Sequence, residues 1–391
     1  MSRMRITLVI AGLGGGGAER IVVNLANAWV KRGYKPTILT ISQNSRPPAY
    51  AINEGVELHD LGWPRRAHEY ELNPKSTAPI VRGLQANNCN ELIHQLTLLA
   101  LLRFAILKTK PNVVVSFITE TNVRVLAALH ESNVPVIVCE VTDARRVWLR
   151  GWQRPRDVFY RRAADVVACD PVIAGWLAAR GFRATAIHSP LLAPNLPAPS
   201  PLVAPIRSNN NSRKRVITLS RLSLEKRPEW LVRAFASVAE RQPDWDLEIY
   251  GLGPQRNFLE HLAEDLAAPG RIRICGFTTD AYGVLAGAHI FVSASWIEGF
   301  GNGIWEAMAC GVPVIALDAG PAVDRIVRHE IDGLVVKHNS VGALAAALER
   351  LMKNETERSR FASRAPEVVN RFSMQAALQK WDALLTPFRT R

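Results

Sequence analysis

Short apolar runs alternate with amphipathic segments along most of the 391-residue chain. The apolar runs are rich in Val, Ile and Leu, which favours strands buried on both faces, and the segments between them carry apolar residues at helical spacing. This alternation predicts parallel sheets with helices on both sides. In the first half we expect strands at residues 5–11, 36–41, 56–58, 112–117, 134–140 and 164–168, and helices at 18–32, 86–110, 121–131 and 171–180.

The composition changes between the two halves of the chain. Residues 188–212 are rich in proline and end in a polar Ser–Asn run, which is typical of a linker. Beyond it we expect strands at 215–220, 246–251, 272–275, 289–295, 313–317 and 333–336, and helices at 229–240, 255–266, 279–286, 304–310, 322–328, 341–353 and 374–385. The sequence therefore predicts two Rossmann-like, doubly wound α/β domains. Their expected boundaries are 1–190 for the N-terminal domain, 191–213 for the linker, 214–370 for the C-terminal domain and 371–391 for a final helix that packs back on the N-terminal domain.

The predicted helix at 86–110 is apolar on nearly all sides. Its longest apolar run, from Leu96 to Leu107, is interrupted by Arg103 and is too short to span a bilayer. Packing in the core is the first explanation. Contact with a membrane interface is the second, because lysines follow the apolar run.

The chain carries a formal net charge of +13, which suggests either an anionic partner or simply a basic surface. The basic residues are spread over the chain and follow no recognised nucleic-acid-binding motif, so we expect no nucleic-acid partner. An anionic membrane surface fits better. The first apolar run leads into a glycine loop and predicts a strand, not a signal peptide, and the five scattered cysteines indicate reduced thiols. We therefore expect a cytoplasmic protein, peripheral at the inner face of the plasma membrane.

A glycine loop follows the first predicted strand. Gly12, Gly14 and Gly17 satisfy the G-x-G-x-x-G pattern of dinucleotide sites, which keeps an NAD(P)-dependent oxidoreductase as an alternative. The next strand, however, ends in Leu39-Thr-Ile-Ser42, without the acid that binds an adenosine ribose. We therefore favour a loop that lets another ligand approach the strand.

The stretch from Ala288 to Leu317 combines a strand, a glycine-broken loop and a short helix. Such a loop lets backbone N–H groups approach an anion, and the helix N-terminus adds positive potential. Two carboxylates, Glu298 and Glu306, bracket the loop and are suited to hydroxyl groups. An anion site with hydroxyl-binding acids indicates a sugar-bearing nucleotide.

These residues carry a resemblance to a known family. The segment Glu298-GFGNGIW-Glu306 has the E-x7-E motif of the retaining glycosyltransferases of family 4, and the N-terminal GLGGGGAER resembles that family more loosely. The supporting motifs are SRL (220–222) followed by Lys226, YGLGP (250–254), GF (276–277) and DGLVV (332–336). The resemblance implies a GT-B fold, in which two Rossmann-like domains face a cleft. It is strongest to enzymes that build lipid-linked or surface oligosaccharides such as lipopolysaccharide.

The resemblance also implies an activity and a role for each motif residue. A hexosyl or N-acetylhexosaminyl group would pass from a nucleotide sugar, for which UDP is favoured, to a lipid-linked or polysaccharide acceptor. Catalytic roles fall to Arg221 and Lys226, which would neutralise the diphosphate, and to Glu298, which would bind the transferred sugar. Glu306 would bind the ribose. Further donor contacts would come from Phe277 beside the base, from backbone N–H groups of Phe300, Gly301 and Asn302, and from Gly15 and Gly16.

The chain departs from the family where many members have a sugar-contacting histidine. The comparable stretch, Ser116-Phe-Ile-Thr-Glu-Thr-Asn122, has none, so we expect Glu120 or Asn122 to contact the donor sugar in its place. Because the carboxyl ends of strands face the ligand crevice in open α/β sheets, we also take Glu120, Asn122 and, after the next strand, Asp143 as acceptor-side candidates. No Asp-x-Asp pair lies in a suitable loop, so no metal or other cofactor is expected. A non-catalytic basic protein that binds membrane or nucleic acid remains a further alternative.

Overall fold

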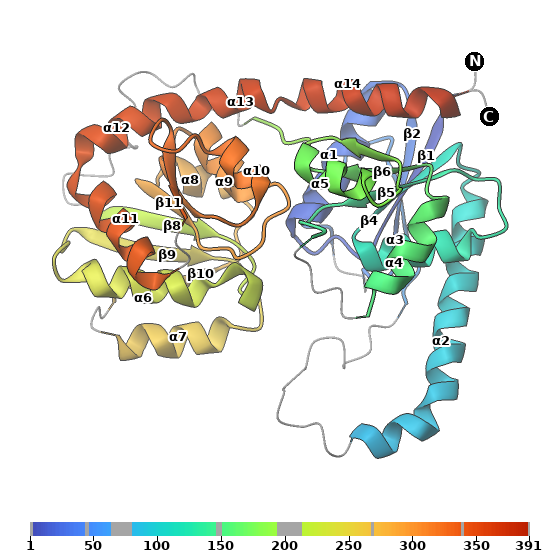
Figure 1. Ribbon diagram of the computed structural model, residues 1–391, viewed down its shortest axis with the longest axis horizontal. Helices are drawn as coiled ribbons and strands as arrows, with labels where there is room; N and C mark the ends of the chain where they lie inside the picture. Colours follow the sequence, from blue (N-terminus) through green and yellow to red (C-terminus); the bar gives the residue numbers. More distant parts are fainter. Residues whose placement is uncertain are drawn as a thin grey trace.

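The computed structural model describes residues 3–43, 47–63, 80–145, 151–193, 213–266, 270–337 and 340–389, and only the backbone of residues 80–91. Two parallel sheets with helices on their faces lie side by side (Figure 1). The predicted fold class, two Rossmann-like α/β domains, is confirmed. The predicted linker at 191–213 lies for the most part outside the described residues.

Among the described residues the first sheet has seven strands in the order β3-β2-β1-β4-β5-β6-β7. All neighbours pair in parallel, and the central strands are buried throughout because helices cover both faces. The strands are β1 (Arg5–Ile10), β2 (Lys35–Thr40), β3 (Glu57–Asp60), β4 (Val113–Phe117), β5 (Val136–Glu140), β6 (Asp165–Ala168) and β7 (Ala184–Ala186).

Helices cover both faces of this sheet and form a separate apolar core on each. One core contains α1 (Gly17–Lys31), and the other contains α2 (Ile80–Lys108), α3 (Thr119–Ala128) and α5 (Pro171–Ala178). The sequence pattern missed β7 and the short helix α4 (Gln153–Phe159). Neither has a continuous apolar run: β7 is half-buried throughout, and the buried residue of α4 is Arg156.

In the described part of the second domain the strand order is β10-β9-β8-β11-β12-β13. The strands are β8 (Lys214–Leu219), β9 (Trp245–Tyr250), β10 (Ile272–Gly276), β11 (Ile290–Ser293), β12 (Val314–Leu317) and β13 (Gly333–Val336). The helices around them are α6 (Pro228–Ala239), α7 (Arg256–Asp265), α8 (Ala281–Ala286), α9 (Asn302–Ala309), α10 (Pro321–Ile326) and α11 (Val341–Lys353). The order reverses between β8 and β11, as it does between β1 and β4 in the first sheet. Ligands of such sheets bind at this switch point, beyond the carboxyl ends of the strands.

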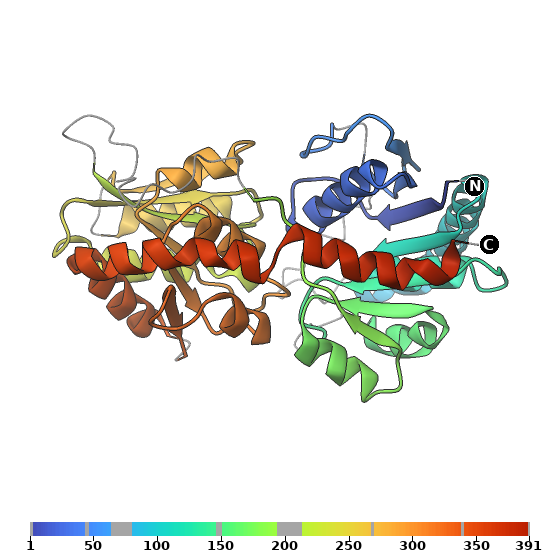
Figure 2. The same cartoon turned by 90° about the horizontal axis from the view of Figure 1, so that it is seen from above.

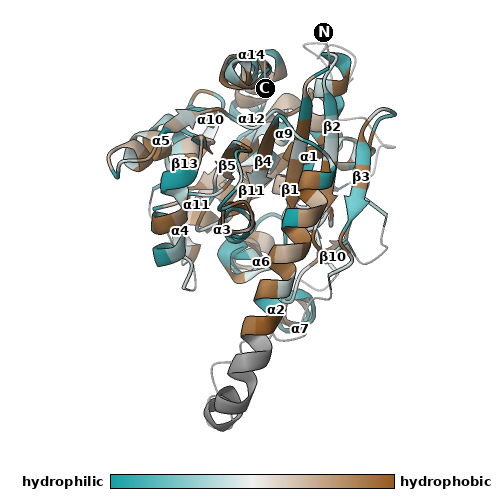
Figure 3. Ribbon diagram, turned by 90° about the vertical axis from the view of Figure 1, so that its right-hand side faces the viewer, coloured by the Kyte–Doolittle hydropathy of each residue, from teal (hydrophilic) through white to brown (hydrophobic). Residues whose placement is uncertain are grey.

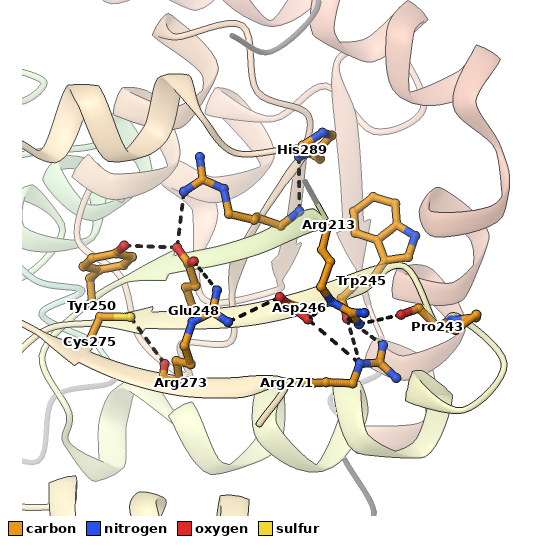
Figure 4. Close-up of polar contacts among 11 residues, drawn as sticks. Arg213, Pro243, Trp245, Asp246, Glu248, Tyr250, Arg271, Arg273, Cys275 and His289 are labelled. Atoms are coloured by element: carbon orange, nitrogen blue, oxygen red, sulfur yellow. Dashed lines mark hydrogen bonds and ion pairs between the residues drawn. The ribbon is translucent and has the colours of Figure 1, made fainter. Parts of the chain in front are cut away.

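A charged ladder crosses β8, β9 and β10 on one face of the second sheet (Figure 4). Asp246 and Glu248 of β9 are almost fully buried beneath arginines from both sides. Arg213 Nε lies 2.6 Å from an Asp246 oxygen, and Arg273 bridges the two acids, with its Nη2 2.6 Å from Glu248. Tyr250 donates to Glu248 as well, at 3.0 Å. Cross-strand charge pairs thus add to the backbone pairing of β8, β9 and β10.

The last helices run from the second domain back across the first (Figure 2). After α12 (Glu355–Arg364) and α13 (Val368–Arg371), which the sequence pattern also missed, α14 (Met374–Leu385) joins the core beside α1. Trp381 packs edge-on against Trp29 with ring centroids 5.6 Å apart. Asp382 accepts hydrogen bonds from Arg32 and Tyr34. The first domain is therefore built from both ends of the chain.

Helix α2 projects from the first domain (Figures 1 and 3). One stripe of it is buried in the core, at Leu98, Leu102 and Ile106. The opposite side leaves apolar side chains exposed, and Phe104 is the most open at 69%. The exposed set is Leu92, Ile93, Leu96, Leu101, Phe104 and Leu107. Among the described residues no helix is long and apolar enough to cross a membrane.

Candidate functional site

The glycine loops of the two domains face each other at the carboxyl ends of β1 and β11. Gly15 has a left-handed backbone (φ +97°), and a Cβ there would lie 2.9 Å from the Phe277 ring. The carbonyl of Gly17, two residues after Gly15, accepts a hydrogen bond from the Asn302 side chain at the start of α9, at 3.2 Å. The structure therefore brings Gly15, Phe277 and Asn302, three of the predicted donor-binding residues, into one place.

Two of the three predicted catalytic residues form an ion pair. Lys226 Nζ lies 2.6 Å from Glu298 Oε1, with side-chain exposures of 24% and 15%. The loop that carries Glu298 is fixed at both ends, because Trp296 N donates to Glu225 O and Glu298 N donates to Ala319 O. The third residue, Arg221, is exposed just after β8. Strand β8 pairs with β11, so all three side chains start from neighbouring strand ends.

The loop after Glu298 leads into an uncapped helix. Gly301, the N-cap of α9, has φ +89°, and among the described residues no side chain caps the helix. The first N–H groups of a helix have no intrahelical partners, which leaves them available to an anion. The Phe300 ring points elsewhere: it is buried and stacks on His188 with ring centroids 6.0 Å apart. Phe300 can therefore contribute only its backbone, as predicted for the three residues of this cradle.

Glu306, one turn into α9, is buried and meets a cation from the other domain. Arg20 of α1 donates from its Nη1 to Glu306 Oε1. The Arg20 guanidinium also lies over the rings of Tyr50 and Tyr282, at 5.4 and 5.2 Å from their centroids. Burial raises the pKa of the Glu306 carboxyl, and Arg20 opposes this rise. Burial likewise raises the pKa of Tyr50 to about 12.

Sequence reasoning missed Arg20, Tyr50 and Tyr282. One signal for Arg20 was available, because a cation in the first turn of a helix is unfavourable next to the positive end of the helix dipole. Such a residue has to be stabilised by a partner outside its helix. No local pattern marks the two tyrosines, which contact Arg20 from different domains.

A second row of contacts joins the domains beside Glu298. A Cβ on Gly299 would lie 1.9 Å from the Val141 carbonyl oxygen, so only glycine lets this loop approach the end of β5. Arg325 of α10 contacts Asp170 at 2.9 Å. The Glu298 loop is thus seated directly on the first domain.

The structure does not favour two of the acceptor-side candidates, Asn122 and Asp143, because neither side chain is exposed. Asn122 is fully buried, and its amide accepts from Ser116 and donates to Cys139 O and Tyr160 OH, so no part of it is left for a substrate. Asp143 is also fully buried, and Arg145 binds both of its oxygens.

Glu120, the remaining acceptor-side candidate, is partly exposed. It pairs with Arg124 one turn along α3, at 2.7 Å. Within the described ranges no group of three or more His, Cys, Asp and Glu side chains could hold a metal ion.

Two family models match the chain. Residues 16–189 match the model described as Glycosyl transferase 4-like domain, and residues 204–368 match the model described as Glycosyl transferases group 1. Together they take in every strand of the two sheets except β1, and every predicted catalytic and donor-binding residue except Gly15.

Relatives and solved structures point the same way. An uncharacterized glycosyltransferase of Haemophilus influenzae is 23% identical over 95% of this chain and 96% of its own length. The lipopolysaccharide core biosynthesis glycosyltransferase LpsD of Rhizobium meliloti is 34% identical over 41% of this chain, a match that covers 46% of LpsD. A crystal structure of S. aureus TarM in complex with fondaparinux, alpha-GlcNAc-glycerol and UDP superposes with a TM-score of 0.75 at 13% identity, over 98% of this chain and 99% of that one.

Proposed function

The chain belongs to the family-4-like glycosyltransferases with the GT-B fold, and we propose that it transfers a hexosyl or N-acetylhexosaminyl group from a UDP sugar to a lipid-linked or polysaccharide acceptor. The proposed transfer retains the anomeric configuration and uses neither a metal nor another cofactor. The acceptor belongs to cell-surface glycan synthesis, which is supported by the names of LpsD and of the glycerol glycoside bound to TarM.

The observation that carries the proposal is the cluster of Lys226, Glu298 and the uncapped start of α9. A nucleoside diphosphate leaves with growing negative charge, and fixed positive groups stabilise that charge in the transition state. Without a donor, Lys226 is paired with Glu298. A bound donor would offer Lys226 a diphosphate oxygen, and Glu298 would then accept hydrogen bonds from the hydroxyls of the transferred sugar. Arg221 supplies a second cation.

Work at an anionic membrane surface is part of the proposal. The net charge of +13 favours such a surface, and the exposed apolar side of α2 offers hydrophobic contact with it. A lipid-linked acceptor would be presented there, on the cytoplasmic face.

The donor is tested with a thermal-shift panel of UDP-, GDP- and ADP-linked sugars. A donor that binds the folded state raises the unfolding temperature, so we expect a shift with UDP sugars. A shift with GDP-mannose alone would replace UDP by GDP in the proposal. Tight binding of NAD(P)H in the same panel would count against a sugar donor.

Retention and metal independence are tested on the product and in the assay. NMR of the product should show an α-linkage from an α-linked donor, and EDTA should leave the rate unchanged. A β-linked product, or a rate that needs added Mg²⁺ or Mn²⁺, would overturn the corresponding part of the proposal.

A further inference from the structure

Glu306 belongs to the second domain, but its positive partner belongs to the first. Arg20 reaches across from α1 to the Glu306 carboxylate, 286 residues away in the sequence, so the pair exists only while the two domains are in contact. We propose that Arg20 is a positioning residue for the nucleoside, which orients Glu306 for the donor ribose and does so only when the two domains are closed. This inference rests on the proposed function.

The Glu306 carboxylate has room for both Arg20 and a ribose. Its Oε1 accepts from Arg20, whereas Oε2 has no donor among the described residues. A carboxylate held through one oxygen can accept hydroxyl hydrogen bonds at the other, and ionised acceptors make the stronger bonds. Arg20 therefore need not leave when a nucleoside arrives.

Aromatic contacts fix the Arg20 guanidinium in place. Tyr50, whose hydroxyl donates to the Gly15 carbonyl at 2.9 Å, ties Arg20 to the glycine loop. Tyr282 contacts Arg20 from α8 and donates to the Leu192 carbonyl at 2.5 Å, at the start of the interdomain segment. The Arg20 side chain thus contacts Tyr50 of the first domain and both Tyr282 and Glu306 of the second, which must part when the domains separate.

Arg20 also determines the charge of Glu306. The other titratable groups that face the pair are Tyr50, Tyr282 and Cys310, and burial raises the pKa of all three, so they stay neutral near pH 7. Glu306 is then the group that titrates. Loss of the Arg20 cation from the assembled site would leave a buried carboxyl without its partner, and such a carboxyl takes up a proton at a higher pH than usual. A protonated Glu306 has lost much of its strength as an acceptor.

The inference is tested by UDP binding to the full chain, measured by calorimetry from pH 6 to pH 9. In Arg20→Gln the pKa of Glu306 should rise further, so a larger fraction of the carboxyl is protonated and UDP affinity falls by about tenfold or more. The loss should shrink as the pH rises through the raised pKa, because the carboxylate then forms again. Wild-type affinity should vary less over the same range.

Two further variants and one further ligand distinguish a positioning role of Arg20 from a simple loss of structure. Arg20→Lys keeps the charge and should bind UDP with a pH profile close to wild type. Arg32→Gln, at the end of the same helix and paired with Asp382, should behave as wild type. Removal of both ribose hydroxyls, with 2′,3′-dideoxyuridine diphosphate as the probe, should weaken binding to wild type but change little in Arg20→Gln.

Different results would contradict the inference about Arg20 and the proposed function. If wild type binds UDP and Arg20→Gln binds it equally well at every pH, the inference about Arg20 is overturned and the proposed function stands. An equal loss from the dideoxy probe in both proteins would also overturn it. If no nucleotide or nucleotide sugar binds wild type, the proposed function fails, and the inference fails with it.

Discussion

At the scale of single residues, exposure separates the side chains that can act on a substrate from those that support the fold. Lys226, Glu298 and Arg221 keep open surface at the strand ends, whereas Asn122 and Asp143 are wholly enclosed by protein partners. All five follow a predicted strand within a few residues in the sequence. Tertiary contacts decide which of these side chains are buried. For Asn122, one such contact is the hydroxyl of Tyr160, which lies 38 residues further along the chain.

The first prediction concerns Lys226. Lys226→Ala removes a cation from the diphosphate site and leaves Glu298 without its partner, so we expect kcat to fall by about 10²–10³-fold in a transfer assay. The fold should survive, because the pair is partly exposed. Lys353→Ala, which breaks a pair with Glu349 on α11, is the matched control and should keep full activity. Full activity of Lys226→Ala would contradict the assignment.

The second prediction concerns Asn122. Asn122→Ala leaves the buried hydroxyls of Ser116 and Tyr160 with one partner fewer, so we expect a loss of about 1–3 kcal/mol in the free energy of unfolding. Urea denaturation measures the loss. The kcat of the folded fraction should be unchanged. A large drop in kcat with unchanged stability would restore Asn122 as a substrate contact.

At the scale of elements, the sequence predicted the central strands and the helices with a clear apolar face. Their bounds differ from the observed ones by a few residues, except for α2, which begins six residues before the predicted 86–110. The sequence-based prediction failed for elements whose local composition does not match their tertiary environment. Helix α12 is strongly polar, with Phe361 as its one fully buried apolar residue, and its Glu357 forms an ion pair with Arg350 of α11. The same holds for the candidate site. The E-x7-E motif could be predicted because it lies within one loop and helix, whereas Arg20 and Tyr282 could not, because they meet only at the interface between the domains.

The third prediction belongs to helix α2. Leu96→Glu and Phe104→Glu place charges on its exposed apolar side, where side-chain exposures are 56% and 69%. If this side enters an anionic membrane interface, each change should weaken vesicle binding by about tenfold, measured by co-sedimentation with phosphatidylglycerol-containing vesicles. Phe258→Glu, on α7 of the second domain and 49% exposed, is the control. Equal binding by all three variants and wild type would remove α2 from the proposed membrane contact.

At the scale of the whole molecule, the chain passes between the domains twice. The first passage lies in the segment after Leu192, and the second is the helical run from α12 to α14, which ends in the core of the first domain (Figure 2). Two connections restrict how the domains can move relative to each other. Opening and closing of the site must therefore bend both.

The fourth prediction tests the second connection. Trp381 is 2% exposed and packs against Trp29, so Trp381→Ala should cost about 3–5 kcal/mol of stability. The loss should fall on the first domain, which scanning calorimetry would show as a low-temperature transition separated from that of the second domain. Trp296→Ala, at an exposed position, should leave both transitions in place. A uniform shift of a single transition would mean that the domains unfold as one unit.

The placement of α14 also has a consequence for synthesis on the ribosome. The second domain is encoded in one continuous stretch and has all its strands before residue 337, whereas the first domain must wait for Ala377, Leu378 and Trp381 to complete its core. The first domain is therefore synthesised before the second but completes its apolar core after it. During translation, the apolar face around Trp29 stays uncovered until α14 emerges, and a nascent chain halted before α14 would present that apolar surface to chaperones.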